Sequence, residues 1–375
     1  MINYNIESTF IRKRGSNYNV YIEYINEEGK RKQKSLAKYG TKKEAEKHLI
    51  DLKSSINNNK FILSKDITFV ERYKKYHEDP SKNFSPTTLY RRESTIKVNL
   101  EPFFKDTKLK DVTPSMLQSF INAMFAKYTK SGAEPITGVV KAVLNEAYRL
   151  KEINENPCHF VKNPPALRES IESFEVYDKD EVKNVINKLE GTNIEIPILL
   201  MLTMGLRTGE VCGLRWQDID FKNNTISINQ VLIYVKNEIK FKQPKTKGSI
   251  RTISAPQELM NKLKKWKSKH NEYRLSSILE YEDLVCLNSK LTPFIPASLR
   301  ERWKNFTKGN SIRYIRMHDL RHTHATFLVL SGTDFKTISN RLGHTDIQIT
   351  LNRYSHVLKE MDTKASDNIS NLMFK

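Results

Sequence analysis

A stretch without any apolar period, from Asn163 to Ser173, is the feature that most constrains how this chain can fold. It contains two consecutive prolines among mostly polar residues, and such a segment interrupts both helices and strands. Periodic apolar patterns lie on both sides of it, which argues against one continuous core. The chain has 375 residues, which is also more than one hydrophobic core usually holds. We therefore expect separate domains joined by a linker at residues 163–173.

Residues 1–60 combine strand and helix patterns. The segment from Val20 to Tyr24 alternates like a strand, and after a turn a second strand is predicted from Lys30 to Leu36. Thr41 has the position of a helix N-cap, and Glu44, three residues later, completes a capping box. We predict a small α+β unit.

Residues 66–163 show helical spacing only. Apolar residues recur with this period from Ile67 to Tyr76 and from Ile136 to Tyr148. Ser85–Pro86 and Thr113–Pro114 both match an N-cap followed by proline at the first helical position. These patterns predict an all-α domain.

Residues 174–375 predict a mainly α domain that contains a small antiparallel β-sheet. Helical patterns cover residues 178–189 and 194–204, and residues 225–228 and 245–253 alternate like strands. Helical patterns then continue to the end of the chain.

The formal net charge of +20 indicates a polyanionic partner. Nucleic acid is the first choice and an anionic membrane surface the second, while a lysine-rich protein without such a partner is the alternative. No run of eighteen apolar residues occurs, so we expect no transmembrane helix, and the N-terminus lacks the features of a secretory signal. The three cysteines are far apart in the sequence, which fits a reducing cytoplasm better than a disulfide framework or a zinc cluster.

Basic residues crowd the predicted N-terminal strands and one predicted helix of the all-α domain. The candidates for DNA contacts are Arg12, Lys13, Arg14, Lys30, Arg31, Lys32, Arg91 and Arg92. A basic pair of strands can lie in the major groove of DNA. A solvated, charged hairpin without a binding role explains the N-terminal residues equally well, and this segment alone does not decide between the two.

Two segments of the last domain place a cation where a phosphate could bind. Arg207 lies in a glycine-rich turn at a predicted helix start, where its planar guanidinium can grip a phosphate, and Glu210 can orient it one turn later. Lys245 lies in a tight turn that we expect between two strands, with Lys247 close by. Taken alone, each feature is more often structural or simply solvated.

Two later segments add histidines, a second arginine and a tyrosine. His318 and Arg321 are three residues apart, so they share one face of a predicted helix and can bind the same phosphate. His318 and His322 also have the spacing of metal ligands, but no second ligand set accompanies them and Arg321 would repel a cation. We therefore expect no metal. Tyr354 falls ten positions after His344.

The order of these segments resembles the tyrosine recombinase (phage integrase) family. Residues of the expected type fill all six catalytic positions of that family, which are Arg207, Lys245, His318, Arg321, His344 and Tyr354. The segments 342–344 and 353–357 also resemble the family's C-terminal signature, and the resemblance extends from about Phe174 to the end. Lys247 remains an alternative to Lys245, because the turn is longer than in some relatives.

The resemblance implies three domains and a way of assembling on DNA. Residues 1–60 would form an arm-type DNA-binding domain, residues 66–163 a helical, SAM-like core-binding domain, and residues 174–375 the catalytic domain. The two larger domains would clamp core sites on double-stranded DNA, and a homotetramer would exchange strands through a Holliday junction. A directionality factor and a host DNA-bending protein are the implied accessory partners, in the cytoplasm of a bacterial host.

The matched residues supply a strand-transfer chemistry that needs no cofactor. Tyr354 would attack a phosphodiester to give a covalent 3′-phosphotyrosine and a free 5′-hydroxyl, which conserves the bond energy without ATP. The two arginines would stabilise the pentavalent phosphorane, and His344 would add a hydrogen bond. Because the pKa of free tyrosine is about 10, His318 is assigned as the base that removes its proton, and Lys245 as the acid that protonates the leaving 5′-oxygen.

Two other functions fit parts of this pattern. A type IB topoisomerase-like enzyme would use the same chemistry to relax DNA, but the basic N-terminal unit suits a second DNA site and argues against it. A non-catalytic DNA-binding regulator would have no need of Tyr354. The predicted function is therefore a site-specific recombinase that integrates and excises a phage or mobile element.

We predict that DNA cleavage proceeds in EDTA and without ATP, because the sequence has neither a P-loop nor an acidic metal triad beside its arginines. The measurement is formation of covalent protein–DNA adducts on DNA from the flanks of the gene, with parallel reactions in EDTA and in magnesium. Strict dependence on magnesium would assign the protein to another class of nuclease.

Overall fold

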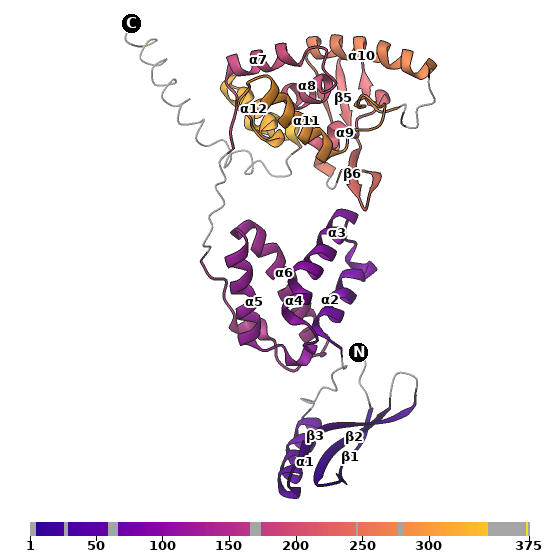
Figure 1. Cartoon of the computed structure of the whole chain (residues 1–375), viewed down its shortest axis with the longest axis vertical. Coiled ribbons are helices and arrows are strands. Elements are labelled where there is room, and N and C mark those ends of the chain that lie inside the picture. Colours follow the sequence, from indigo (N-terminus) through magenta and orange to yellow (C-terminus); the bar gives the residue numbers. More distant parts are fainter. Residues whose placement is uncertain are drawn as a thin grey trace. The chain divides into compact units, whose positions relative to one another are not determined.

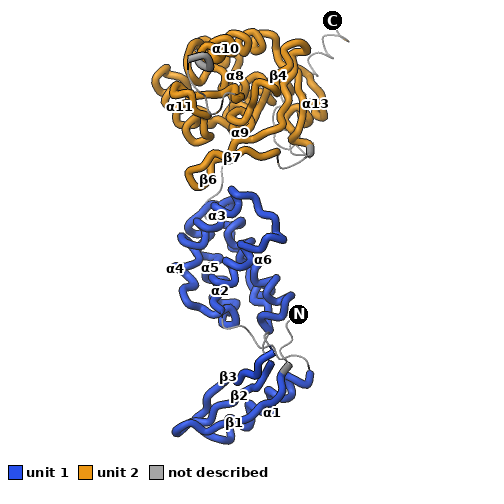
Figure 2. The backbone as a smooth tube through the Cα atoms, turned by 90° about the vertical axis from the view of Figure 1, so that its right-hand side faces the viewer, with its two compact units in different colours: residues 1–171 blue, residues 172–375 orange. Residues whose placement is uncertain are grey.

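The computed structural model describes residues 5–25, 29–58, 67–165, 174–244, 247–276, 281, 283–343 and 373. The chain divides into two compact units, residues 1–171 and residues 172–375 (Figure 2). The boundary falls within the predicted linker, of which residues 166–173 lie outside the described part. No helix among the described residues is long and apolar enough to cross a membrane.

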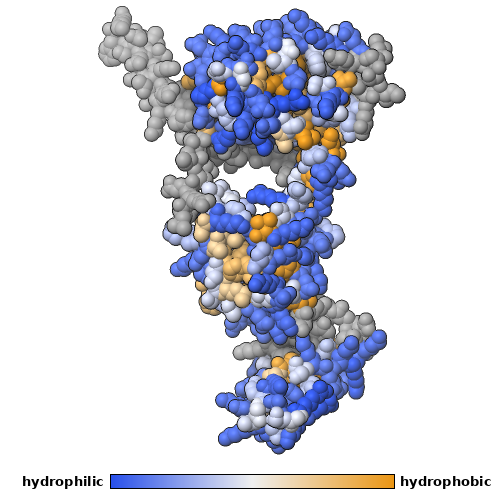
Figure 3. All heavy atoms as spheres, in the orientation of Figure 1, coloured by the Kyte–Doolittle hydropathy of each residue, from blue (hydrophilic) through white to orange (hydrophobic). Residues whose placement is uncertain are grey.

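The first part of unit 1 is a three-stranded antiparallel sheet with one helix against it. The elements are β1 (Asn5–Arg14), β2 (Asn17–Ile25), β3 (Arg31–Tyr39) and α1 (Lys42–Asn57), and β2 is the central strand. Val20 and Ile22 of β2 are fully buried with Ala45 and Leu52 of α1. Hydrophilic residues cover most of the visible face of this part (Figure 3).

The sequence analysis missed one strand here and overstated one cap. β1 escaped the analysis because it has few apolar residues and a register irregularity between Ile6 and Ser8. Thr41 is the N-cap of α1 and accepts a bond from the Glu44 backbone N–H at 3.4 Å. The Glu44 carboxylate, however, accepts from the Thr41 hydroxyl at 2.8 Å, so the reciprocal bond of a capping box is missing.

The second part of unit 1 is the predicted helical domain (Figure 1). Its longer elements are α2 (Phe69–Glu78), α3 (Pro86–Thr95), the π-helix η2 (Ile96–Leu100), α4 (Glu101–Phe104), α5 (Pro114–Lys127) and α6 (Lys130–Arg149). Short 3-10 turns lie at η1 (Pro80–Lys82), η3 (Leu109–Asp111) and η4 (Pro157–Phe160). Ser85 and Thr113 cap α3 and α5 as predicted.

The predicted apolar stripes form the core of this domain with one exception. Leu117 and Phe120 of α5 pack against Val140 and Leu144 of α6, and all four are fully buried. Tyr148 is 43% exposed, so its assignment to the stripe was wrong. Tyr148 lies in the last turn of α6, where its ring packs edge-on against the ring of His159 instead of the core. The two ring centroids are 6.1 Å apart.

Unit 2 is mainly helical with two small antiparallel sheets. Its helices are α7 (Lys179–Leu189), α8 (Glu195–Met204), α9 (Thr208–Cys212), α10 (Gln257–Ser276), α11 (Pro296–Gly309), α12 (Met317–Leu330) and α13 (Phe335–Leu342). One sheet has the order β4 (Ile219–Asp220), β5 (Thr225–Ile228), β8 (Arg251–Ser254), and the other pairs β6 (Val231–Val235) with β7 (Glu238–Lys242). The 3-10 turns are η5 (Trp216–Asp218) and η6 (Lys247–Ser249).

Helix α8 is the centre of the unit 2 core. Nearly all of its residues are buried, and it contacts α7, α10 and α12. Its C-terminal end, at Met204, therefore has a fixed position relative to α12, and the residues that follow it begin the candidate site.

The predicted strand at residues 245–253 was wrong at residues 247–250, and residues 245 and 246 lie outside the described part of the chain. A strand is present only from Arg251, and it pairs with β5 rather than with the strand just before it. Residues 247–249 form the turn η6 instead, and Ile250 is 44% exposed. Polar and apolar residues alternate here, which is why a strand was predicted. Of the two isoleucines, however, Ile253 packs in the core and is 7% exposed, whereas Ile250 does not.

We predict that Leu144→Ala destabilises the protein by about 2–5 kcal/mol, because Leu144 is fully buried and its truncation leaves a cavity. Leu150→Ala is the matched control, since Leu150 is 49% exposed, and it should change the free energy of unfolding by about 0.5 kcal/mol at most. Chemical denaturation of the full chain measures both. Equal losses would show that the α5–α6 interface is not the core of this domain.

Candidate active site

Arg207 is placed by the end of α8 and the start of α9. Gly205 closes α8 in the left-handed conformation, with φ of 66°, and Arg207 is the N-cap residue of α9. Glu210 accepts bonds from the Arg207 backbone N–H and from its Nη1, both at 2.9 Å. The Arg207 side chain is 37% exposed whereas that of Glu210 is 2% exposed, so a buried carboxylate orients a guanidinium that solvent can reach. The sequence had indicated this role for Glu210.

Arg321 lies inside the unit rather than on its surface. Its guanidinium donates to the Gly205 carbonyl at 2.7 Å and to the Leu342 carbonyl at 2.6 Å, and the residue is 1% exposed. It therefore ties α12 to the ends of both α8 and α13. His318, one turn earlier on α12, is exposed, and its ring meets the ring of His322 edge-on at 4.8 Å.

Three arginines hold the last turn of α13 by successive backbone carbonyls. Arg251 donates from Nε to the Arg341 carbonyl at 2.8 Å, Arg321 to the Leu342 carbonyl, and Arg207 from Nη2 to the Gly343 carbonyl at 3.2 Å. The last carbonyls of a helix have no partner within it and carry partial negative charge, so cations stabilise them. His344 is the next residue of the chain.

Two glycines permit this close packing. Gly343 ends α13 with φ of 66°, and a Cβ atom there would lie 2.9 Å from Nη1 of Arg251. A Cβ atom on Gly205 would lie 2.7 Å from Cδ2 of His324. Both positions combine a left-handed backbone with a close approach, so a side chain at either would displace the residues of the site.

Arg251 and Glu210 form a buried ion pair that the sequence analysis did not identify. Arg251 donates from Nη2 and Nη1 to the two carboxylate oxygens at 2.9 and 3.1 Å, and the side chains are 6% and 2% exposed. Burial alone would raise the pKa of the Glu210 carboxyl, but hydrogen bonds and charges of Arg251 and Arg207 hold that pKa below its usual value. Glu210 is thus an anion shared by two arginines.

The buried His324 and the half-buried Arg341 form a second pair behind the site. Nδ1 of His324 lies 3.0 Å from the Leu202 carbonyl, and Nε of Arg341 donates to Nε2 of His324 at 3.2 Å. Burial, followed by the positive charge of Arg341, lowers the pKa of His324 to about 3. The ring is therefore neutral near pH 7 and carries its proton on Nδ1, since a carbonyl can only accept.

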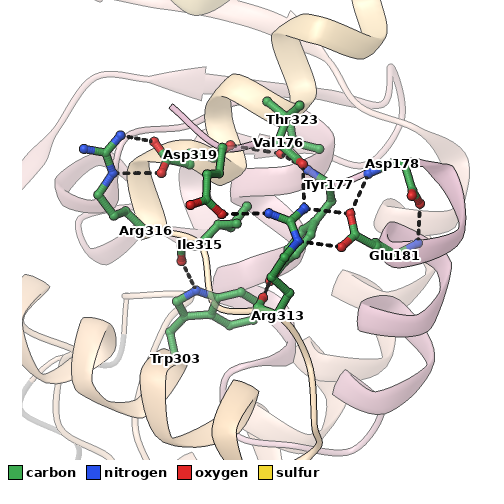
Figure 4. A network of polar contacts seen from close by, with 11 residues as sticks. Val176, Tyr177, Asp178, Glu181, Trp303, Arg313, Ile315, Arg316, Asp319 and Thr323 are labelled. Atoms are coloured by element: carbon green, nitrogen blue, oxygen red, sulfur yellow. Dashed lines mark hydrogen bonds and ion pairs between the residues drawn. The ribbon is translucent and has the colours of Figure 1, made fainter. Parts of the chain in front are cut away.

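The start of α12 is fastened to the first residues of unit 2 (Figure 4). Arg313 donates to both oxygens of Glu181 at 2.8 Å and to the Val176 carbonyl at 2.8 Å. The Thr323 hydroxyl accepts from the Tyr177 backbone N–H at 3.2 Å. These bonds join residues 176–181 to the helix that carries His318 and Arg321.

Two further contacts fix the loop that enters α12. Arg316, the N-cap residue of α12, donates to Asp319 from Nε and Nη2 at 2.8 and 3.0 Å. Nε1 of Trp303, from the core of α11, donates to the Ile315 carbonyl at 2.9 Å (Figure 4). His318 therefore follows a segment whose backbone is held on both sides.

Three of the six predicted catalytic residues lie outside the described residues: Lys245, His344 and Tyr354. Lys247 is the first residue of η6. The described half of the set comes from the N-cap position of α9, which is Arg207, and from α12, which carries His318 and Arg321. No group of three or more His, Cys, Asp or Glu side chains suited to a metal occurs in the described part of the chain.

The predicted DNA contacts of unit 1 differ in how open they are. Arg12, Lys13, Arg14, Lys30, Arg31 and Lys32 are all exposed. The guanidiniums of Arg12 and Arg14 lie 5.5 and 5.9 Å from the Tyr21 ring, and Nε of Arg31 lies 2.8 Å from Glu7. In the helical domain Arg91 is exposed, whereas the guanidinium of Arg92 stacks on Phe84 at 3.8 Å.

Comparison with known protein families gives three matches along the chain. The model of the phage integrase family matches residues 175–361, and the model of the phage integrase N-terminal SAM-like domain matches residues 68–125. A model of an arm DNA-binding domain matches residues 10–56.

Individual proteins are similar over most of the chain. A tyrosine recombinase XerC-like protein of Caldanaerobacter subterraneus subsp. tengcongensis is 29% identical over 89% of this chain and 91% of its own length. The ICEBs1 integrase of Bacillus subtilis is 23% identical, again over 89% of this chain and 91% of its own length. The Tn1549 transposon integrase, solved in complex with a circular intermediate DNA, has a similar fold, with a TM-score of 0.67, 20% identity, and coverage of 79% of this chain and 99% of that one.

We predict that His324 makes the stability of the protein depend on pH below about 6.5, the usual pKa of histidine. The pKa in the folded state is lower, at about 3, so the unfolded state binds the proton first as the pH falls. The free energy of unfolding is unaffected above the unfolded pKa and decreases by up to about 1.4 kcal/mol per pH unit below it. Denaturation at about pH 7.5 and about pH 5 measures this loss.

The variant for this test is His324→Asn, whose amide can keep the bond to the Leu202 carbonyl and does not titrate. It should lose less stability on acidification than the parent. His159→Asn, at an exposed position, is the control and should behave like the parent. If the two variants show the same pH dependence, His324 is not the group responsible.

Proposed function

Because this chain belongs to the phage integrase family and is a tyrosine recombinase, an enzyme that cleaves and rejoins DNA strands, we propose that Tyr354 is its nucleophile and that Arg207 and Arg321 bind the scissile phosphate. The observation that supports this assignment is that both arginines donate hydrogen bonds to backbone carbonyls at the C-terminal end of α13. The next residue is His344, and Tyr354 follows ten positions later. α13 and its C-cap Gly343 therefore end beside both arginines, one residue before His344.

The electrostatics of the arginines suit a phosphorane. Arg207 is oriented by Glu210 and partly exposed, so it can meet a nonbridging oxygen with little rearrangement. Arg321 is buried and adds its charge from within the unit, where a low dielectric strengthens its attraction for the developing anion. His344 would add a hydrogen bond to the same phosphate.

Two proton transfers complete the reaction. His318 takes the phenolic proton as Tyr354 attacks phosphorus, and the exposed position of His318 leaves it accessible to the nucleophile. The bond from phosphorus to the 5′-oxygen breaks, and Lys245 protonates that oxygen, with Lys247 as the alternative. Attack of a 5′-hydroxyl on the phosphotyrosine reverses each step and rejoins the strand without a cofactor.

Each predicted domain has a role in this proposal. The exposed basic residues on β1 and β3 would bind arm sites, and the helical domain with residues 174–375 would bind core sites. A homotetramer on double-stranded DNA would exchange the strands. A directionality factor and a host DNA-bending protein would then decide between integration and excision.

We predict that Tyr354→Phe abolishes covalent adducts and leaves DNA binding intact, because only the attacking oxygen is removed. The matched control is Tyr314→Phe, since Tyr314 is 41% exposed in the same unit and has no role in the mechanism. Incubation with a core-site duplex, followed by denaturing electrophoresis, detects the adduct. An adduct formed by the Tyr354 variant would assign the nucleophile elsewhere.

A further inference from the structure

Arg251 contacts the segment that leads back to the predicted catalytic lysine. Its Nη1 donates to the Ser249 carbonyl at 3.0 Å, at the end of η6. Ser249 lies four residues after Lys245 and two after Lys247.

The same guanidinium contacts two other parts of the candidate site. It binds both oxygens of Glu210, which in turn holds Arg207, and it donates from Nε to the Arg341 carbonyl at the end of α13. Arg251 itself is fixed in the sheet, where it pairs with Ile228 of β5. One buried side chain therefore joins η6, the carboxylate that orients Arg207, and the end of α13.

This arrangement exceeds what a stabilising ion pair requires. Arg215 and Asp218 form a comparable two-bond pair, at 2.9 Å for both bonds, but those residues are neighbours within one turn. Arg251 instead bonds to residues 41 and 90 positions away as well as to Ser249. Only a planar group with several donors in fixed directions can satisfy these acceptors together, which lysine cannot do.

We propose that Arg251 is a positioning residue for the general acid, a role that rests on the proposed function of Lys245. It sets η6, the turn that begins two residues after Lys245, relative to Arg207 and to the end of α13. The 5′-oxygen leaves on the side of phosphorus opposite Tyr354, so the acid must be aligned with the phosphate-binding groups and cannot be placed independently of them. An error of about 1 Å in such an alignment can cost about 100-fold in rate.

The test is Arg251→Lys. This substitution keeps the positive charge beside Glu210 but removes the planar guanidinium, whose several N–H groups bond to Glu210, Arg341 and Ser249 at once. Single-turnover cleavage is measured on two core-site duplexes that differ only in the 5′-bridging atom, oxygen or sulfur. We expect cleavage of the oxygen substrate to slow by about 100-fold and the sulfur substrate to recover most of this loss, because a thiolate leaves without protonation. Equal slowing on both substrates would overturn the proposal.

A second variant protects the test against misfolding. Two glycines inserted between Ile250 and Arg251 lengthen the connection to Ser249 and leave the ion pair with Glu210 in place. This insertion should reproduce the preference for the sulfur substrate, and the absence of that preference would also overturn the proposal. In both variants the reaction amplitude reports the folded fraction, while the rate constants on the two substrates are compared within one preparation.

Controls separate this proposal from the assignment of the lysine. Arg215→Lys alters the local ion pair and should cleave both substrates like the parent. Lys245→Ala and Lys247→Ala should show which lysine variant the sulfur substrate rescues. If neither is rescued, the proposed general acid fails. If one is rescued and Arg251→Lys is not, the acid stands and only the positioning role fails.

Discussion

Arginine side chains bonded to the carbonyls that end α13 organise the candidate site. The three donors come from the start of α9, from β8 and from α12, which are distant in the sequence and come together at this helix end. A helix end offers an array of acceptors with fixed directions and partial negative charge, so it can gather several cations that would otherwise repel one another. The position of each arginine then depends on the other two through the backbone they share.

The charge balance of this region favours a phosphate ligand. Glu210 is the carboxylate that pairs with both Arg207 and Arg251, while Arg321 and Arg341 bond to backbone carbonyls and to His324. Burial, followed by the charge of Arg251, lowers the pKa of Arg341. The positive charges that lower this pKa would also stabilise an anion placed close to them, such as a phosphate.

The sequence predicted the local features of the fold and the contact of Glu210 with Arg207, but not the buried contacts behind them. Caps such as Ser85 and Thr113 are encoded by adjacent residues, which is why they could be identified. Arg251 and His324 have no such local signal, because their partners lie far away in the chain. The same holds for β1, where sheet pairing stabilises a strand of weak apolar pattern.

The β6–β7 ribbon has a consequence for how such enzymes diversify. It is inserted between β5 and β8, yet among the described strands β6 and β7 pair with each other alone. The turn between them uses Lys236 and Asn237, with φ of 53° and 63°. Residues added at that tip would leave the pairing of β5 with β8 unchanged. The position of Arg251 opposite Ile228 would therefore also stay the same. Evolution or protein engineering can therefore lengthen or recode this projection as a module, altering what the enzyme touches while its chemistry stays intact.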